Sequence, residues 1–296
     1  MKLLLGVNVA TTAGGDADPV AAARRAEALG FDFVSASDHP SGDLPTYETW
    51  TMLSWIAAST TRIRVATRVL GVPYRSPAMV AKMAETFDRL SGGRLILGLG
   101  GGYSDEEFRA FGLGVPTARQ KVDGLRDAIE IMRGLWSRER FTHDGSVHGV
   151  QNAPMEPKPE HRIPIWLGTY GPRALDLTGE LADGWIPSLG FAGVDDVPAM
   201  RRRIEAAARA AGRDPAELTL AYNVPVHLDS PGADRGADRD ASAAATVSGS
   251  AIDVIDRLRA FVDLGFTVLN FMPVGADPAE QVERIAHDVL PHLRPD

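Results

Sequence analysis

The chain has 296 residues, 44% of them hydrophobic, and a formal net charge of -8 from 31 basic and 39 acidic side chains. This acidic balance argues against a nucleic-acid partner, because such proteins normally carry a basic patch or stripe. The absence of cysteine excludes disulfides, thiolate metal sites and cysteine nucleophiles.

The opening segment, MKLLLGVNVA, carries one charge and is followed by the small-residue turn TTAGGDAD. A secretory signal peptide has a longer apolar region and a cleavage site, so we interpret this segment as a strand. No apolar window approaches the roughly 18 residues that a membrane-spanning helix needs. We therefore expect a soluble, cytoplasmic protein with no membrane partner.

Short apolar strands then alternate with amphipathic helices along the whole chain. Strands are predicted at residues 3–9, 31–37, 63–72, 94–100, 163–169, 183–189, 218–228 and 266–274. Helices are predicted at residues 18–30, 50–60, 76–93, 173–182, 197–212, 251–265 and 278–293. The first helix has clear end signals, with Asp18 as N-cap, Pro19 at its first position and Gly30 after its last turn.

This alternation is typical of a parallel sheet covered by helices, which belongs to the α/β class. The sheet is either open and doubly wound or closed into an eight-stranded (β/α)8 TIM barrel. Because about eight strand–helix units follow one another without a dividing linker, the order favours a TIM barrel with insertions, over residues 1–296 as one domain.

Two segments depart from the repeat. Residues 141–162 are rich in proline, glycine and histidine, and we expect a long excursion there with a short hairpin around Asp144–Gly145. Residues 229–250 are small or charged and include almost no large apolar side chain. Such a segment buries little, so we expect a mobile loop or one that orders over a ligand. Either segment is a candidate lid.

A glycine-rich turn follows the predicted strand at residues 94–100. Gly98 and Gly100 match the start of a dinucleotide fingerprint, but Tyr103 stands where the third glycine belongs. The turn also lacks the Gly-Lys-Ser/Thr of a P-loop. Neither of these phosphate-binding motifs is therefore present.

The residues after this turn predict a helix start. Ser104 and Glu107 have the spacing of a capping box, in which the serine accepts from the glutamate amide and the glutamate reaches back. Free amides at a helix start attract anions. Gly100, Gly101 and Gly102 leave room for a flat or bulky ligand against the backbone, or else form a tight turn that binds nothing.

A second glycine turn follows the predicted strand at residues 163–169. It contains Gly168, Thr169, Tyr170 and Gly171 before the next helix begins. The amides around Gly171, the Thr169 hydroxyl and the helix start are candidates to hold a phosphate. Two such junctions on one barrel face suggest a long ligand with a phosphate at one end, which is more typical of a cofactor than of a small substrate.

Further candidates lie at strand ends, where barrel enzymes place their reactive groups. His39 follows the second strand and is either structural or a proton or hydrogen-bond donor near neutral pH. Asp38 either orients His39 or holds nearby backbone. No metal site is predicted, since His143 and His148 lie in a long loop without an obvious carboxylate partner.

Arg68 lies in a segment that a buried strand would keep apolar, which indicates that the chain has reached a polar mouth. Arg68 and Arg75 either meet anionic groups of a ligand or form surface ion pairs. The sequence alone leaves both alternatives open.

Four stretches together resemble the luciferase-like monooxygenase superfamily, and most of all its coenzyme F420-dependent oxidoreductases. They are AEALGFDFVSASDH, AASTTRIRVATRVLGVPYRSPAMVAKMAETFDRLSGGRLILGLGGGYSDEEFRAFG, PKPEHRIPIWLGTYGPRALDLTGELADGW and LRAFVDLGFTVLNFMP. The resemblance covers nearly the whole chain. It implies an eight-stranded α/β barrel that holds a flavin or deazaflavin at its mouth.

The resemblance also implies roles for single residues. His39 is expected close to the reactive ring, and the Arg68–Val69 bond is expected to be a cis peptide against the ring face. Together with the strand-end positions, this predicts His39 and Asp38 as catalytic residues. The predicted cofactor-binding residues are Asn8, Arg68, Val69, Gly98, Gly100, Gly101, Gly102, Tyr103, Gly168, Thr169, Tyr170 and Gly171.

The substrate is left open by one departure from the family pattern. In the sugar-phosphate dehydrogenases of this branch, a glutamate directly follows the glycine loop and a tryptophan lies shortly after the histidine. Here Tyr103 follows the loop, and residues 40–47 contain no tryptophan. The resemblance therefore implies a cofactor and a reaction class without naming the substrate.

We predict hydride transfer between coenzyme F420 and a small organic substrate, with His39 donating a proton or polarising that substrate. Two alternatives remain: an FMN-dependent monooxygenase that activates oxygen, and a barrel that binds a flavin without turnover. A homodimer is expected from the resemblance only.

Overall fold

The computed structural model describes residues 3–15, 17–229 and 245–294. Its eight barrel strands are β1 (Leu4–Asn8), β2 (Phe33–Ala36), β3 (Arg64–Thr67), β5 (Leu95–Gly100), β8 (Ile165–Leu167), β9 (Gly184–Trp185), β10 (Thr219–Leu228) and β12 (Val268–Pro273). Each strand pairs in parallel with the next, and β12 pairs with β1, which closes the barrel. The predicted TIM barrel is thus confirmed and the open sheet is excluded.

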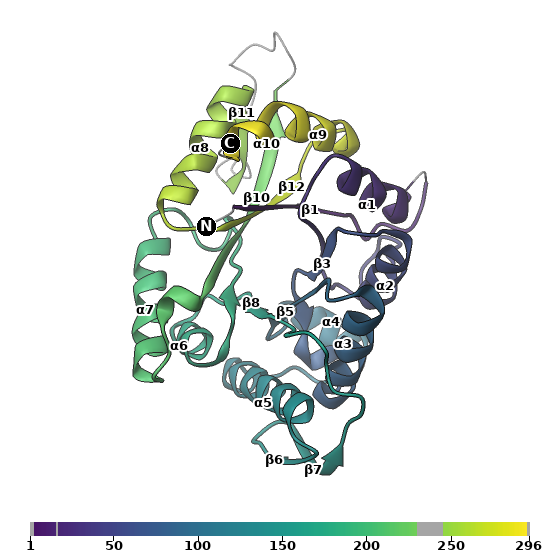
Figure 1. Ribbon diagram of the computed structural model, residues 1–296, viewed down its shortest axis with the longest axis vertical. Coiled ribbons are helices and arrows are strands. Elements are labelled where there is room, and N and C mark those ends of the chain that lie inside the picture. The colour runs from purple at the N-terminus through teal and green to yellow at the C-terminus, as the bar shows by residue number, and fades with distance from the viewer. Residues whose placement is uncertain (1–2, 16, 230–244, 295–296) are drawn as a thin grey trace.

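Helices surround this barrel (Figure 1), and the sequence predicted the following seven except the one at residues 118–137. They are α1 (Pro19–Ala28), α2 (Thr49–Ser59), α3 (Pro77–Ser91), α5 (Ala118–Ser137), α6 (Pro172–Leu181), α7 (Val197–Ala210) and α8 (Ala251–Asp263). The predicted helix at residues 278–293 is divided into α9 (Pro278–Arg284), a π-helical turn (Ile285–Val289) and α10 (Leu290–Leu293). No helix of the described ranges is both long and apolar enough to cross a membrane.

Local residues fix where the first helix begins and ends. The Asp18 carboxylate accepts hydrogen bonds from the amides of Val20 and Ala21, at 3.0 and 2.9 Å. Pro19 has no amide proton and so leaves no donor unpaired at the first helical position. Gly30 ends the helix with a φ of +87°, a conformation that other residues rarely adopt. The predicted helix boundaries are therefore correct for a physical reason.

The main core lies between the barrel and the helices, while the barrel interior has a separate apolar layer. Seven buried side chains form that inner layer: Phe33, Ala66, Ile96, Trp166, Ile186, Ala221 and Val268. Two residues further along their strands are Ser35, Asn223 and Asn270, which are also buried. Since alternate residues of a strand face the same side, the interior changes from apolar to polar toward the carboxyl ends.

The third predicted strand, residues 63–72, is interrupted in the structure. Strand β3 ends at Thr67, the Arg68–Val69 peptide bond is cis, and β4 (Leu70–Gly71) then pairs with β5. The cis bond that the resemblance implied is thus confirmed. A short 3-10 turn, Val72–Tyr74, follows β4 and leads into α3.

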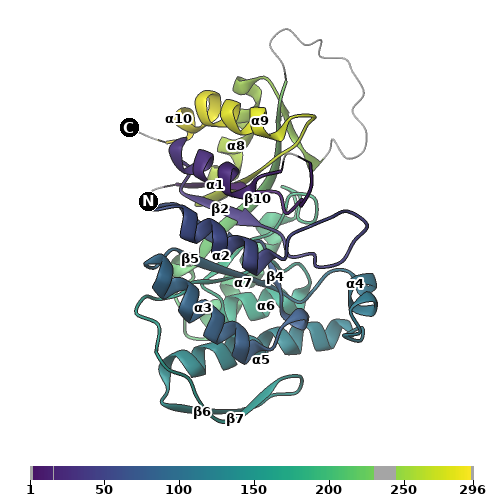
Figure 2. The ribbon, with the colours of Figure 1, turned by 90° about the vertical axis from the view of Figure 1, so that its right-hand side faces the viewer.

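The excursion at residues 141–162 contains the predicted hairpin, formed by β6 (Arg140–Asp144) and β7 (Gly149–Pro154). The hairpin packs against α5 on the outside of the barrel (Figures 1 and 2). His143 and His148 do have a carboxylate partner, contrary to expectation. The His143 ring lies 3.1 Å from the carboxylate of Asp127, which also accepts from the His148 amide at 3.0 Å.

The prediction of a mobile loop at residues 229–250 is wrong for the C-terminal end of that segment. Residues 247–249 form strand β11 (Val247–Gly249), which pairs in parallel with the last residues of β10. The Asp229 amide also donates to the Gly249 carbonyl oxygen at 2.9 Å. Residues 230–244 lie outside the described residues.

Candidate active site

The carboxyl ends of β1 and β3 bring Asn8 and Arg68 together. The Arg68 guanidinium donates from Nε to the Asn8 side-chain oxygen at 3.0 Å. Burial removes water from the guanidinium and lowers the pKa of Arg68 to about 10. Within the described residues no carboxylate forms an ion pair with Arg68. Arg68 is therefore a cation at the mouth that is free to pair with an anionic group.

Val69 explains much of the glycine-rich turn. A Cβ atom on Gly98 would lie 2.0 Å from the Thr67 carbonyl oxygen and 3.1 Å from the Val69 side chain. A Cβ on Gly100 would lie 2.7 Å from Val69, and one on Gly168 would lie 3.2 Å from it. The space expected for a ligand over these glycines is thus occupied by Val69. A ring bound at the mouth would rest on the valine rather than on bare backbone.

Gly101 and Gly102 also have packing reasons to be glycine. A Cβ on Gly101 would lie 3.1 Å from the Lys121 side chain of α5. Gly102 has a φ of +84°, and a Cβ there would lie 2.3 Å from the Phe108 ring. These two glycines allow the turn to pack against the following helices. The structure thus supplies a reason for each of them that requires no cofactor.

The capping box after this turn is only half formed. Helix α4 (Asp105–Ala110) begins as predicted, with the Ser104 hydroxyl accepting from the Glu107 amide at 3.3 Å. The Glu107 side chain does not reach back to Ser104. It is buried, accepts a hydrogen bond from the Tyr74 hydroxyl, and lies 2.9 Å from Nδ1 of His39. Glu107 is therefore part of the site, which its motif did not indicate.

Asp38 holds the backbone next to the site. Its buried carboxylate accepts from the Gly71 amide at 2.9 Å and from both ends of the Arg75 guanidinium, at 2.7 and 3.0 Å. Glu48 also pairs with Arg75. The sequence left two roles open for Asp38, which were to orient His39 or to hold nearby backbone. The observed contacts are those of the second role, since the partners of Asp38 do not include His39.

The second glycine turn uses Thr169 differently from the expectation. The Thr169 hydroxyl lies 2.7 Å from the Thr178 hydroxyl, and its carbonyl oxygen accepts from the Trp185 ring nitrogen at 2.9 Å. Both groups are buried in internal contacts and do not face a ligand. Gly171 is different, because a Cβ atom placed there meets nothing within 4 Å. Gly171 precedes α6, whose first amides lack a side-chain cap.

A chain of buried polar side chains crosses the barrel beneath these residues. Ser35 donates to Asn270 at 3.0 Å, Asn270 donates to Asn223 at 2.8 Å, and Asn223 donates to the Ser188 hydroxyl at 3.2 Å. Local sequence patterns did not indicate this chain of contacts, because its members come from different strands. They give the mouth a polar floor.

Aromatic side chains gather at one side of the mouth. Tyr103 follows β5, Tyr170 follows β8 and Phe191 follows β9. The Tyr103 and Phe191 ring centroids are 5.7 Å apart, and those of Tyr170 and Phe191 are 5.4 Å apart. The Tyr170 hydroxyl accepts from the Ser188 amide at 3.1 Å. Phe191 was not among the predicted site residues, because nothing in its local sequence marks it.

No group of three histidine, aspartate or glutamate side chains in the described part of the chain is arranged to hold a metal ion. The candidate site therefore consists of His39 with Glu107, Arg68 with Asn8, the Val69 side chain, and the three aromatic rings.

Comparisons with known proteins place this site in a family. The sequence profile of the family described as luciferase-like monooxygenase matches residues 3–242. An F420-dependent glucose-6-phosphate dehydrogenase of Kineococcus radiotolerans is 32% identical, over 92% of this chain and 91% of its own. A protein of the same name from Beutenbergia cavernae is 30% identical, over 91% of each chain.

Two solved structures have the same fold. An F420-dependent secondary alcohol dehydrogenase, in complex with an F420-acetone adduct, superposes with a TM-score of 0.86 at 20% identity, over 100% of both chains. A coenzyme F420-dependent tetrahydromethanopterin reductase from Methanopyrus kandleri gives 0.84 at 21% identity, over 99% of this chain and 100% of its own. With the profile match and the relatives above, the chain belongs to the luciferase-like monooxygenase family.

Proposed function

We propose that this protein is an oxidoreductase that exchanges a hydride between coenzyme F420 and a small organic substrate at the carboxyl ends of its barrel strands. Its sequence relatives over nine-tenths of the chain bear the names of F420-dependent enzymes. The observation in the structure that supports this function most directly is the contact between His39 and the buried Glu107 beside the mouth. Barrel enzymes place their reactive groups at this end.

The residues present fit a flat, anionic cofactor. Val69 offers an apolar surface for one face of a ring, and the unpaired Arg68, held by Asn8, offers a positive charge beside it. Gly171 leaves open space before the uncapped start of α6, which suits a phosphate. A deazaflavin bound there supplies the hydride donor or acceptor. The protein's part is to orient the reactants and exclude water.

His39 is the group that handles a proton. Its Nδ1 lies 2.9 Å from the Glu107 carboxylate, which only accepts hydrogen bonds when ionised, so Nδ1 carries the hydrogen. Nε2 is then the nitrogen left to face a substrate oxygen. It takes a proton from a substrate hydroxyl during oxidation and returns it to a carbonyl oxygen during reduction. Asp38 is a positioning residue, because its carboxylate holds the segment that carries Tyr74 and Arg75.

The first experiment measures equilibrium binding of F420 and, separately, of FMN to the purified protein. We expect micromolar or tighter binding of F420 and weak binding of FMN. His39→Ala then loses turnover by about a hundredfold or more while F420 affinity stays the same, since general acid–base catalysis contributes at least that much. A preference for FMN would move the protein to the oxygen-activating branch, and unchanged turnover would remove His39 from the mechanism.

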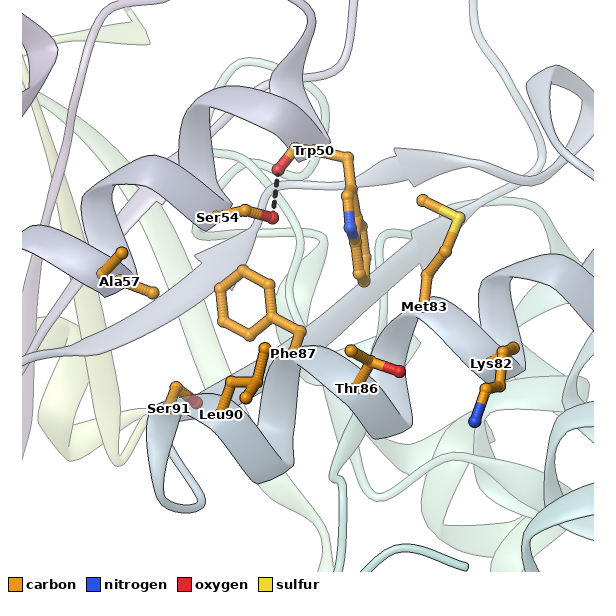
Figure 3. Close-up of a pocket in the computed structure, with 10 residues that line it drawn as sticks. Trp50, Ser54, Ala57, Lys82, Met83, Thr86, Phe87, Leu90 and Ser91 are labelled. Carbon is orange, nitrogen blue, oxygen red and sulfur yellow. Dashed lines mark hydrogen bonds between the residues drawn. The ribbon is translucent and has the colours of Figure 1, made fainter. Parts of the chain in front are cut away.

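We also propose that the protein is a homodimer that associates through α2 and α3. Trp50 and Phe87 line an open pocket of about 340 Å³ between these helices, with their ring centroids 5.6 Å apart (Figure 3). Trp55, Met79 and Leu90 are exposed large apolar side chains on the same two helices. A second copy would cover these side chains. The expected cytoplasmic location stays a prediction.

A further inference from the structure

Exposed apolar side chains are concentrated at the mouth of the barrel. Of the fourteen large apolar residues that are exposed in the described chain, nine lie in loops after the carboxyl ends of barrel strands. They are Leu44, Tyr47, Tyr103, Phe111, Leu113, Val115, Phe191, Val194 and Val274. Apolar surface gathered on one face marks a place where another apolar group binds.

Three rings form the most ordered part of this surface. Tyr103, Tyr170 and Phe191 are here called the aromatic wall. Phe191 lies between the two tyrosines, at centroid distances of 5.7 and 5.4 Å. Tyr103 is 74% exposed and Phe191 is 58% exposed, so both rings keep free surface after they contact each other. Tyr170 is anchored through its hydroxyl to the Ser188 amide. The wall is therefore held in place, yet unoccupied faces remain.

The aromatic wall is connected to His39 through the first turn of α4. Tyr103 directly precedes Ser104, the N-cap of α4, and the first turn of that helix carries Glu107. Glu107 in turn contacts His39 at 2.9 Å. A substrate whose oxygen reaches His39 thus has aromatic surface within the length of a small molecule. Ligand sites commonly combine such an apolar lining with a few placed polar groups.

The charges around the wall disfavour a phosphorylated substrate. Arg75 is paired with Asp38, Lys121 is paired with Asp105 at 3.1 Å, and Arg173 is paired with Asp123 at 2.8 Å. The first turn of α4 is acidic and adds negative charge beside the wall. Arg68 has no carboxylate partner among the described residues, but it is assigned to the cofactor above. A dianionic phosphate that approached Arg75, Lys121 or Arg173 would have to displace these ion pairs.

We infer that the aromatic wall is a substrate subsite that takes the apolar ring or chain of an uncharged alcohol or carbonyl compound. This inference deepens the proposed function and rests on it. It separates this protein from the sugar-phosphate substrate that the names of its relatives state. The polar end of the substrate meets His39, and the apolar end lies against Tyr103 and Phe191.

The test uses 2-naphthalenemethanol as a neutral, fluorescent probe and glucose 6-phosphate as its charged counterpart. Binding of each is measured by titration of the F420-loaded protein, separately from turnover. We expect saturable binding of the probe, and no saturable binding of glucose 6-phosphate. Phe191→Ala and Tyr103→Ala each weaken probe binding about tenfold, because aromatic contact area is lost. Tyr103→Phe keeps the ring and binds the probe as the wild type does.

Ile252→Ala is the matched control, because Ile252 is equally exposed but lies on α8, away from the mouth. It leaves probe binding unchanged. Unchanged probe affinity in both wall variants would overturn the inference. So would a loss of F420 affinity in those variants, since the wall would then contact the cofactor. Saturable binding of glucose 6-phosphate would overturn the assigned substrate class. Failure of the wild type to bind F420 would instead refute the proposed function. Probe titration of the unloaded wild type and wall variants would then still show whether the aromatic wall binds an apolar group.

Discussion

At the scale of single residues, a series of contacts leads from Asp38 back to its neighbour His39. Asp38 accepts from the Gly71 amide, and Gly71 is glycine because a Cβ there would lie 2.4 Å from the Tyr74 ring. Tyr74 donates to Glu107, and Glu107 contacts His39, the neighbour of Asp38. The dipeptide Asp38–His39 is therefore anchored through both of its side chains. This anchoring holds the His39 side chain in place before the reaction, so less conformational entropy is lost when it takes part in the reaction.

Glu107→Gln tests whether this support matters for the reaction. The amide of glutamine keeps one acceptor oxygen but loses the charge, so it cannot accept from Tyr74 and His39 as the carboxylate does. We expect kcat to fall about tenfold to a hundredfold, with F420 affinity unchanged, because the imidazole remains but is less well oriented. Steady-state kinetics separates kcat from KM. Nitrogen NMR of the His39 ring reports directly which nitrogen carries the hydrogen.

Glu106→Gln is the matched control for this experiment. Glu106 lies beside Glu107 in the same helix turn, but its side chain is exposed and has no partner among the contacts that hold His39. We expect this variant to keep the kcat and the ring tautomer of the wild type. A Glu107→Gln variant with the wild-type kcat and the wild-type tautomer would show that Glu107 is only a packing residue.

At the scale of elements, the features that depend on local residue patterns were predicted from the sequence. The features that depend on residues far apart in the chain were missed. The alternation of strands and helices and the ends of α1 follow from periodicity and caps. The residue pattern missed the break in the third strand, because ATRVLGV reads as one continuous strand, and only the resemblance implied the cis bond there. The role of Glu107 was missed for a different reason. Its partners Tyr74 and His39 are 33 and 68 residues away, so no motif spacing contains them.

One carboxylate of α5, that of Asp127, binds several groups of the β6–β7 hairpin. Burial alone would raise the pKa of Asp127, but the amides of His148 and Val147 and the ring of His143 donate to the charged form, and the net effect lowers that pKa. A carboxylate whose pKa is lowered by folding stabilises the folded state above its ordinary pKa, near 3.9. This contribution is lost as the pH falls through the lowered pKa of the folded protein.

We therefore expect the protection factors of the hairpin amides, corrected for the intrinsic pH dependence of exchange, to fall below about pH 3.9, while those of the barrel strands stay high. Asp127→Asn removes the charge and accelerates exchange of the hairpin at neutral pH as well. Asp144→Asn is the comparison, because Asp144 lies in the same hairpin but is exposed. Equal exchange of the hairpin in wild type and Asp127→Asn at neutral pH would contradict this account. Activity should stay close to that of the wild type, since the hairpin lies outside the barrel.

At the scale of the whole molecule, the pairing of β1 with β12 joins the two ends of the chain in one sheet. We therefore propose that residues 1–296 fold as one unit. Apart from Val147 and Ile252, the exposed large apolar side chains of the described residues lie in two places. One is the mouth, where the aromatic wall meets the candidate active site, and the other is the outer face of α2 and α3. A substrate is small enough to cover the first, whereas the second is a surface of two helices and suits a protein partner.

The Leu90→Glu variant tests whether the outer face of α2 and α3 forms the dimer interface. Leu90 is 83% exposed on α3, so the variant should fold, but a dimer formed through this face would have to bury the new charge without a partner. We expect light scattering to give twice the mass of one chain for the wild type and the mass of a single chain for Leu90→Glu. Ile252→Glu, a similar change on α8, should remain a dimer. F420 binding should survive in both variants, because the mouth belongs to one chain. A wild-type monomer, or a dimer that Leu90→Glu leaves intact, would rule out association through α2 and α3.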